Sequence, residues 1–444
     1  MSEVKIFKFG GSCLKESNDL EAVVQRIVES SQEKTVVVVS ALHGVTDRIL
    51  ERLEHNDRES ISAFVASIEM MHLEISPTLV NDAYYSKFRD ALAALSEALL
   101  DYCENSSEIS KIRAQIAGEQ MSSVAVSAAV SACGIDSKPI WSEEFGIKIH
   151  KVKGESVIDI DSTIKSLNIP DVSVLVVTGW YGMLDEEPGL LARGGSDLTA
   201  TSLAAVLNAS EVTIWRDVSG VLALSPRWAI PSRNLPYLSY TEAQELALFS
   251  EPVLHPFAVE PLRKEGIPLR LRPLHNPSDV GSCIGPSIAT GEPSVRAVGC
   301  LPHLVPLTMR LSGVMSVAKV VADATILLDR ARIRVWSLRA RPNEARFLVS
   351  QRVASRAMRL LSESPGLPTP NQGDAISILC LVGESIGNNF SISSEIEEFT
   401  RQSNLKLTPL DEGKRDHALH YTVSDEQTQE ALVSIAENFD LLIP

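Results

Sequence analysis

The first forty residues constrain the fold most, because two β-branched runs flank a single amphipathic pattern. The runs are Val4–Phe9 and Thr35–Ser40. The apolar residues between them follow the i, i+3, i+4, i+7, i+8 spacing of a helix with one apolar face: Leu20, Val23, Val24, Ile27 and Val28. Asn18 and Glu21 have the spacing of a capping pair near its start. A strand, a crossover helix and a second strand are therefore predicted, as in an α/β sheet.

The same alternation continues to about residue 295. Further elements are predicted as strands at Ser173–Thr178, Glu211–Trp215 and Leu269–Arg272, and as helices over 46–134 and Ser196–Leu207. Alternating strands and helices indicate a mostly parallel sheet sandwiched by helices. We therefore assign residues 1–295 to one α/β domain.

The pattern changes after residues 276–293, a stretch rich in Pro, Gly and Ser that marks a boundary. Each of the two segments that follow, 296–365 and 366–444, has the order strand, helix, strand, strand, helix. The predicted elements are 304–311, 315–329, 333–338, 346–350 and 353–362, then 375–382, 391–402, 405–409, 418–423 and 425–438. This βαββα repeat predicts two ferredoxin-like domains.

Composition disfavours several partners. The chain has 41 Lys and Arg against 57 Asp and Glu, and a net charge of −16 disfavours nucleic acid and anionic membrane surfaces. The longest apolar stretches, 36–39 and 172–183, are shorter than the ~20 residues of a membrane-spanning helix. A strand beginning at Val4 leaves no room for a leader peptide, so a cytoplasmic protein is expected.

The six cysteines show neither the C-x-x-C or Cys/His spacing of a zinc site nor the pattern of a disulfide framework. They are Cys13, Cys103, Cys133, Cys283, Cys300 and Cys380. We expect at least five of them to be small buried apolar residues.

Residues 8–12, Lys-Phe-Gly-Gly-Ser, place a lysine and two glycines at the end of the first predicted strand. Glycines let backbone N–H groups approach an anion closely, and Lys8 can neutralise phosphate charge. The G-x-x-x-x-G-K spacing of a Walker loop is absent. Taken alone, the segment is a phosphate-binding turn or, more commonly, an ordinary Gly-Gly turn.

Residues 192–197, Ala-Arg-Gly-Gly-Ser-Asp, place a second Gly-Gly pair directly before a predicted helix. The helix N-terminus can hold an anion, and Arg193 offers a planar fork for a carboxylate. The alternative is an N-capping Ser-Asp beside a solvated arginine. Two such turns near the carboxyl edge of one sheet favour a binding site over coincidence.

Three further segments are weaker signals. Residues 40–47 form a strand-end loop with hydroxyl groups, and 118–120, Gly-Glu-Gln, lie in a helical region. Residues 215–217, Trp-Arg-Asp, end a strand before the basic turn 225–227. Taken alone, the first is more commonly a connecting loop, the glutamate of the second more commonly lies on a solvated face, and the alternative for the third is a surface loop. His43 and His255 lack sequence partners, so a catalytic histidine is not expected.

Together, however, these segments resemble the aspartate kinase family. The motifs K-F-G-G-S, S-A-x-x-G-V-T-D, G-E-Q-x-S, R-G-G-S-D, W-x-D-V-x-G-V, P-R and V-L-H-P occur in the family's order. The resemblance covers nearly the whole chain, because the two βαββα units are similar to the family's paired ACT domains. It implies an amino-acid kinase domain at 1–295, followed by ACT domains at 296–365 and 366–444.

The resemblance also implies roles for individual residues. Lys8 and Asp197 would be catalytic, with Asp197 and Asp217 nearest the phosphates and Mg²⁺. L-aspartate would be bound by Ser40, Thr46, Glu119, Arg193, Gly194, Gly195 and Ser196. ATP would be bound by Lys8, Gly10, Gly11, Ser12, Trp215, Arg216, Asp217, Leu222, Arg227 and Val253. No particular metal ligand set is implied.

Several positions depart from the family pattern. Pro252 stands where the family has a nucleotide-contacting lysine, Leu222 replaces a tyrosine, and Ser225 replaces the Asp of D-P-R. These changes bear on nucleotide affinity more than on the aspartate pocket. The loops 312–316 and 383–389 also differ from the usual effector-binding pattern, so an amino-acid effector at the ACT domains is possible but not specified.

The expected activity is transfer of the ATP γ-phosphoryl group to the β-carboxylate of L-aspartate, giving 4-phospho-L-aspartate on the route to lysine, threonine and methionine. Two alternatives stay open. One is another amino-acid kinase, and the other is a catalytically weak amino-acid sensor or regulatory subunit. Ferredoxin-like sheets expose edges, so a homo-oligomer formed through ACT pairing is expected.

Overall fold

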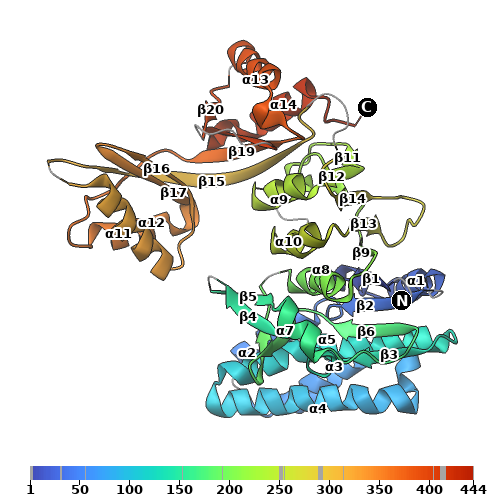
Figure 1. Ribbon diagram of the computed structural model, residues 1–444. Coiled ribbons are helices and arrows are strands. Elements are labelled where there is room, and N and C mark those ends of the chain that lie inside the picture. The colour runs from blue at the N-terminus through green and yellow to red at the C-terminus, as the bar shows by residue number, and fades with distance from the viewer. Residues whose placement is uncertain are drawn as a thin grey trace. The chain divides into compact units, whose positions relative to one another are not determined.

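The computed structural model describes residues 4–30, 33–55, 57–152, 154–192, 194–249, 254, 256–288, 294–313, 315–403, 405–410 and 417–443. The chain forms two compact units. The first unit comprises residues 1–221, 234–244 and 252–288, and the second comprises 222–233, 245–251 and 289–444. The second unit therefore includes two short segments that precede the predicted boundary at residue 295. Figure 1 labels the elements of both units.

The first unit contains an eight-stranded sheet in the order β12-β14-β13-β9-β1-β2-β6-β3. Its strands are β1 (Val4–Phe9), β2 (Lys34–Val39), β3 (Ser137–Ile140), β6 (Val174–Thr178), β9 (Glu211–Arg216), β12 (Tyr237–Ser239), β13 (Leu269–Pro273) and β14 (Ser282–Gly285). Among the strand pairs of this sheet that the structure describes, only that of β13 with β14 is antiparallel. The predicted mostly parallel sheet is thus confirmed, and all five predicted strands belong to it.

Helices cover both faces of this sheet (Figure 1). One face packs in a core with helices α1 (Ser17–Glu29), α2 (Val45–Glu54), α3 (Ile61–Ile75), α4 (Asp82–Asn105) and α5 (Glu108–Ala132). Phe7 and Phe9 of β1 point into that core. Helix α8 (Gly195–Leu207) packs on β1 and β2, and α10 (Pro256–Glu265) packs on α8. Because side chains alternate along a strand, Lys8 points to the α8 face.

Smaller elements complete the first unit. They are helices α6 (Ser142–Phe145) and α7 (Ile160–Ser166), the hairpin of β4 (Ile149–Val152) and β5 (Glu155–Ile158), the hairpin of β7 (Tyr181–Leu184) and β8 (Glu187–Leu190), and β11 (Asn234–Leu235). Strand β10 (Val221–Leu222) and helix α9 (Tyr240–Phe249) are each divided between the units.

The predicted capping pair of α1 is wrong. The structure shows a capping box between Glu16 and Asp19, because the helix begins at Ser17, and Asn18 and Glu21 lie inside it. The predicted pair lies two residues too late in the sequence, and both pairs have the three-residue spacing of a capping box.

The second unit contains a seven-stranded sheet in the order β16-β17-β15-β19-β21-β20, with β18 beside β15. Its strands are β15 (Ala297–Arg310), β16 (Val335–Arg341), β17 (Glu344–Ser350), β18 (Asn371–Gln372), β19 (Ile376–Val382), β20 (Thr408–Pro409) and β21 (Ala418–Ser424). Its helices are α11 (Val317–Arg330), α12 (Gln351–Ser362), α13 (Phe390–Gln402) and α14 (Thr428–Asn438). Both βαββα orders are confirmed.

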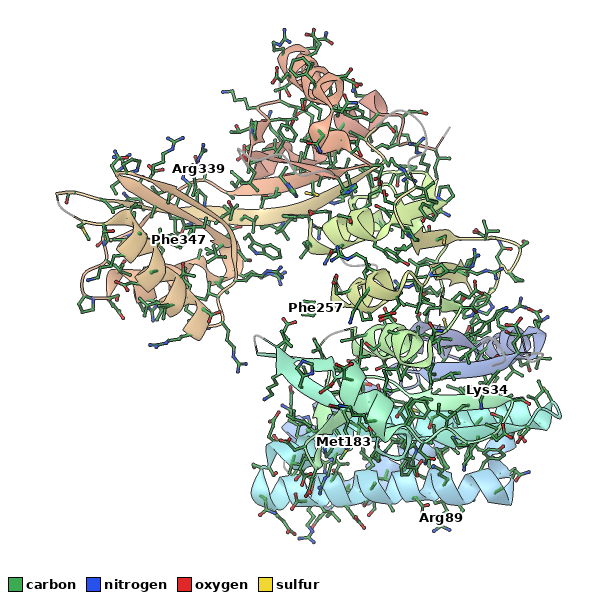
Figure 2. The ribbon with its side chains drawn as sticks, in the orientation of Figure 1. Lys34, Arg89, Met183, Phe257, Arg339 and Phe347 are labelled. Carbon is green, nitrogen blue, oxygen red and sulfur yellow. The ribbon has the colours of Figure 1, made fainter. Side chains whose placement is uncertain are left out.

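Strand β15 joins the two repeats into one sheet. Its first part pairs with β19 and its last part pairs with β17, with an irregularity between Leu301 and Leu304. The predicted strand 304–311 is therefore longer than expected and begins at Ala297. Figure 2 shows Phe347 on the side of this sheet that α11 and α12 cover and Arg339 on the other side of the same strands.

No helix within the described ranges is long and apolar enough to cross a membrane.

Candidate active site

A cavity of about 490 Å³ opens at the carboxyl edge of the parallel sheet in the first unit. The residues that line it are Lys8, Ser40, Thr46, Asp47, Glu119, Trp180, Leu191, Gly194, Gly195, Ser196 and Asp197. They come from the ends of β1, β2, β6 and β8, from the starts of α2 and α8, and, for Glu119, from α5. Because neighbouring parallel strands end at one edge, segments far apart in sequence meet there.

Lys8 forms a short ion pair in the lining of this cavity. Its Nζ lies 2.6 Å from Oδ1 of Asp197, and both side chains are about one-tenth exposed. Asp197 also accepts from Arg216, whose guanidinium lies 3.2 Å from Oδ2. Two cations therefore flank one carboxylate beside the N-terminus of α8. An anionic ligand would be stabilised at this end of the cavity.

Glu119 is a buried carboxyl group in the lining of the same cavity. It lies on α5, is 3 % exposed, and its Oε1 accepts from the backbone N–H of Ala41 at 3.3 Å. Its Oε2 is buried and has no hydrogen-bond partner among the residues that the structure describes. Burial raises the pKa of Glu119 to about 8, although the Ala41 bond opposes the shift. The position is poised to accept a cation or a hydrogen-bond donor.

The glycines of the second Gly-Gly turn are required by close packing and by backbone conformation. Gly194 is the N-cap of α8, and its φ of 80° is a left-handed conformation that residues with a side chain disfavour. A Cβ at Gly195 would lie 2.7 Å from both Leu191 and Trp180. The backbone at the start of α8 can thus face the cavity directly, as expected for an anion-binding helix N-terminus.

Three lining residues were not among those predicted: Asp47, Trp180 and Leu191. Trp180 follows β6 and adopts φ 69°, an uncommon conformation for a tryptophan. Its backbone N–H donates to Thr199 Oγ1 at 3.2 Å. Strained residues of this kind cluster at functional sites. Asp47 could have been found, because it ends the S-A-x-x-G-V-T-D motif, whereas nothing in the sequence marked Trp180.

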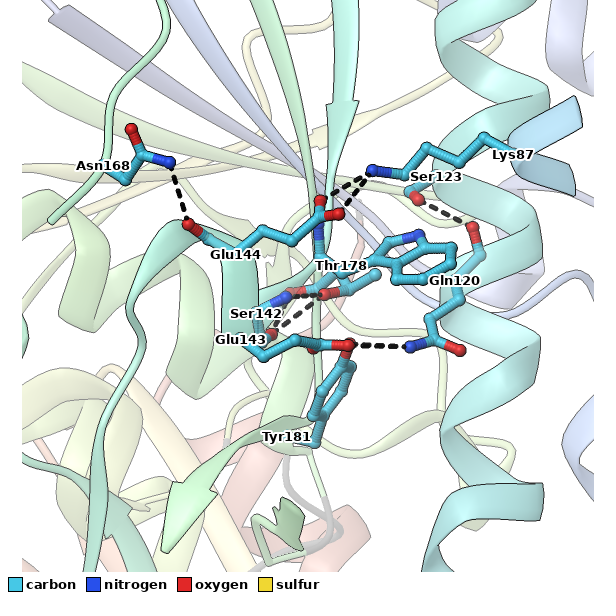
Figure 3. Close-up of polar contacts among 10 residues, drawn as sticks. Lys87, Gln120, Ser123, Ser142, Glu143, Glu144, Asn168, Thr178 and Tyr181 are labelled. Carbon is cyan, nitrogen blue, oxygen red and sulfur yellow. Dashed lines mark hydrogen bonds and ion pairs between the residues drawn. The ribbon is translucent and has the colours of Figure 1, made fainter. Parts of the chain in front are cut away.

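Behind the cavity, a polar network joins α5, α6 and β7 (Figure 3). Gln120 Nε2 donates to Glu143 Oε1 at 3.1 Å and to the Tyr181 hydroxyl at 3.3 Å, and that hydroxyl donates to Glu143 Oε2 at 2.6 Å. Burial and the neighbouring Glu143 raise the pKa of Tyr181 well above its ordinary value. The network fixes the residues that follow Glu119 and Trp180 in sequence, so it holds both lining residues in place.

The first Gly-Gly turn lies beside the cavity lining and not in it. Gly10 precedes the 3₁₀ turn Gly11–Cys13, and a Cβ at Gly10 would lie 3.0 Å from Lys8 Nζ. Next to this turn, Lys15 Nζ lies 3.0 Å from Asp217 Oδ2. Burial opposes ionisation of Asp217, but hydrogen bonds from Lys15 and Ser12 and the Lys15 charge lower its pKa. A carboxylate and a cation thus adjoin the turn.

The remaining predicted residues have different positions. Trp215 is 3 % exposed and stacks on Phe9 in the core, on the side of the sheet away from Lys8, so it does not line the cavity. Leu222 and Arg227 belong to the second unit, where the Arg227 guanidinium lies 4.6 Å from the centroid of the Trp228 ring. Arg193 and Val253, like Pro252, lie outside the described residues.

The comparisons with known proteins agree with this fold and site. Residues 3–273 match the model of the amino acid kinase family, which is more than half of the chain. The chain therefore belongs to the amino acid kinase family.

Within that family, the similar proteins are aspartokinases. The chain is 24 % identical over 470 residues to aspartokinase 2, chloroplastic, of Arabidopsis thaliana, covering 98 % of this chain and 84 % of that protein. It is 25 % identical to the bifunctional aspartokinase/homoserine dehydrogenase 2 of the same plant, covering 98 % of this chain and 50 % of that protein. The chain thus spans about half the length of several curated relatives that it matches.

The crystal structure of E. coli aspartokinase III in complex with aspartate and ADP has a TM-score of 0.81 at 19 % identity. The match covers 99 % of this chain and 100 % of that one. At this identity the likeness shows a shared fold, which includes the C-terminal sheet region.

Proposed function

We propose that this protein is an aspartate kinase, which transfers the ATP γ-phosphoryl group to the β-carboxylate of L-aspartate. The observation that carries the proposal is that one cavity is lined both by Lys8 and a helix N-terminus and by a buried glutamate. Phosphates and an amino-acid ammonium group require those two environments. The aspartokinase relatives support the same activity.

At the amino-acid end, Glu119 would hold the ammonium group of aspartate. Ser40 and Thr46 line the same cavity with hydroxyl groups, and Gly194, Gly195 and Ser196 supply the helix start. The family resemblance assigns Arg193, which is adjacent in sequence, to the α-carboxylate. A guanidinium that binds the α-carboxylate and a carboxylate that binds the ammonium group together select a zwitterion.

At the phosphate end, Lys8 would neutralise the transferring group. A carboxylate nucleophile has a pKa near ~3.9 and is ionised at pH 7, so no general base is needed. One β-carboxylate oxygen forms a bond to the γ-phosphorus while the bond to the bridging oxygen breaks and ADP leaves. The protein must bring two anions together in line, which makes positioning and charge neutralisation its main tasks.

On the first unit, the nucleotide site would be completed by five further residues: Gly10, Gly11, Ser12, Arg216 and Asp217. Leu222, Arg227, Val253 and Trp215 are carried over from the resemblance, and for Trp215 only an indirect role through the packing of Phe9 fits its burial.

Mg²⁺ is the metal that such a reaction implies. It prefers hard oxygen donors, and the carboxylates of Asp197 and Asp217 at the sheet edge supply them, although the ion would displace the cationic side chains with which they pair. Bound with ATP, the ion would neutralise phosphate charge. Lys8 and Arg216 would then be free to turn from Asp197 toward phosphate oxygens.

The two alternatives are another amino-acid kinase and a catalytically weak sensor or regulatory subunit. Turnover of ATP with a panel of acceptors, with hydroxylamine trapping of the acyl phosphate, separates all three. Hydroxamate formation with L-aspartate alone supports the proposal. Turnover with glutamate, N-acetylglutamate or carbamate in its place, or absence of turnover with every acceptor, would select one of the alternatives.

We also propose a cytoplasmic homo-oligomer that pairs through the second unit and can take an amino-acid effector there. In the described part of its sheet, β16 and β20 stand at the two ends of the strand order. Edge strands are available for pairing with another copy. Analytical ultracentrifugation tests this: a mass of 48.3 kDa at micromolar concentration would contradict pairing.

A further inference from the structure

The second unit contains a cluster of three side chains that the proposed reaction does not use: Glu245, Cys380 and His420. One donor atom from each lies within 4.8 Å of the other two. Cys380 is fully buried and the His420 side chain is 2 % exposed. His420 Nε2 and Glu245 Oε2 are 3.4 Å apart. No Cys/His spacing in the sequence indicated this cluster.

The fold brings these groups together by register and by one glycine. Cys380 on β19 and His420 on β21 are direct antiparallel partners, so their side chains share one face of the sheet. The residue opposite Cys380 on its other side is Gly299 of β15, and a Cβ there would lie 3.3 Å from the backbone oxygen of Phe249. The absence of that side chain lets the end of α9 lie close to the sheet.

Glu245 lies one helical turn before Phe249 on α9, so the two residues share a helix face. The Phe249 ring lies 4.6 Å from the His420 ring, and the Glu245 carboxylate reaches the same histidine. The third donor therefore approaches the Cys–His pair from a helix above the sheet. Donors from three separate elements converge on one point in the interior.

We propose that Glu245, Cys380 and His420 bind a transition-metal ion, with Zn²⁺ as the preferred metal. Thiolate, imidazole and carboxylate are the ligand types that Zn²⁺ takes, at ~2.0–2.3 Å each, which places tetrahedral donors about 3.3–3.7 Å apart. The histidine–glutamate separation of 3.4 Å falls in that range. A thiolate ligand disfavours Mg²⁺ and Ca²⁺. A water molecule would fill the fourth position.

The competing explanation is an ion pair between His420 and Glu245 beside an ordinary buried cysteine. Metal binding differs from it in one measurable way, because the Cys380 thiol must lose its proton and bond to the ion. The ion would fasten residue 245, and hence the end of α9, to strands β19 and β21. It would act as a structural clamp within the second unit.

Co²⁺ titration of the full chain, after treatment with chelator, tests the proposal. We expect one Co²⁺ per chain with the near-ultraviolet absorption of a cobalt–thiolate bond and the strong visible bands of tetrahedral geometry, both removed by one equivalent of Zn²⁺. Circular dichroism should be unchanged, and the thermal midpoint should rise on loading because only the folded chain binds. Absence of thiolate absorption in the wild-type chain would overturn the proposal without any variant.

Variants then assign the site. Cys380→Ser should abolish the thiolate band, and Glu245→Gln, at a less buried position, should weaken Zn²⁺ binding at least tenfold while leaving the fold intact. Cys300→Ser is the matched control, because Cys300 is equally buried but pairs with Leu379, so its side chain lies on the other face of the sheet. A band that survives in Cys380→Ser, or that is lost in Cys300→Ser, would show that the ligands are wrong.

Discussion

Aspartate binding should release a proton from Glu119. Burial raises the pKa of this side chain to about 8, so in the free protein it is mostly protonated at pH 7. An ammonium group bound to it favours the carboxylate and lowers that pKa. Each aspartate bound at pH 7 should therefore displace about 0.9 proton, and above pH 9 almost none.

The same linkage sets how aspartate affinity changes with pH. Below the free pKa, each pH unit costs ~1.4 kcal/mol of binding free energy, because the proton must first be removed. The aspartate KM should therefore fall roughly ninefold from pH 6 to pH 7 and about fivefold more from pH 7 to pH 8, then level off. The KM for ATP should not follow this profile.

Isothermal titration of aspartate at pH 7, in buffers with different ionisation enthalpies, counts the released protons directly. Glu119→Gln is the control, because an amide of the same shape has no proton to release. Its residual binding should be weaker and independent of pH. A proton count of zero for the wild-type chain, or a pH profile that persists in Glu119→Gln, would refute the role of this residue.

Stability gives an independent measurement that needs no substrate. Because the folded pKa of Glu119 exceeds its ordinary value of 4.5, the free protein should lose stability as the pH rises from about 4.5 to about 8. Glu119→Gln should remove this contribution, so its advantage in thermal midpoint over the wild-type chain should grow across that window. An advantage that is constant with pH would mean that Glu119 is not protonated in the free protein.

Three further outcomes are expected. Lys8→Ala should lower kcat by two or more decades, corresponding to ~3–4 kcal/mol, in a chain with unchanged circular dichroism, and near-normal turnover would exclude the role of Lys8. Burial lowers the pKa of His72 to about 4, so stability should fall as the pH drops from about 6.5 to about 4; His72→Leu should lessen that fall, as thermal melts at several pH values can show. Pro252→Lys should tighten ATP binding by roughly one to two decades without changing the aspartate KM, and equal ATP affinities by calorimetry would show that position 252 does not face phosphate.

The sequence alone determined most of the secondary structure and the edge at which the site lies. β-branched runs indicate four of the five predicted strands, and alternating Leu and Arg indicate the fifth, 269–272. The two βαββα orders indicate the C-terminal repeat, because local periodicity is set by which faces must be buried. The second Gly-Gly turn marked backbone that lines the cavity, whereas the first lies beside the lining. Of the residues predicted to bind aspartate, Ser40, Thr46, Glu119 and the 194–196 turn all line one cavity.

The tertiary structure decided what depends on register and on distant neighbours. Trp215 faces the core because β9 pairs with β1 in a register that places it beside Phe9, and a motif cannot state which side of a sheet a residue will face. Trp180 lines the cavity through a backbone conformation that its sequence does not reveal. The cluster of Glu245, Cys380 and His420 forms because β19 pairs with β21 and because Gly299, which has no side chain, lets α9 pack close to the sheet. Secondary structure follows from the pattern of consecutive residues, whereas contacts between residues far apart in sequence depend on how separate elements pack.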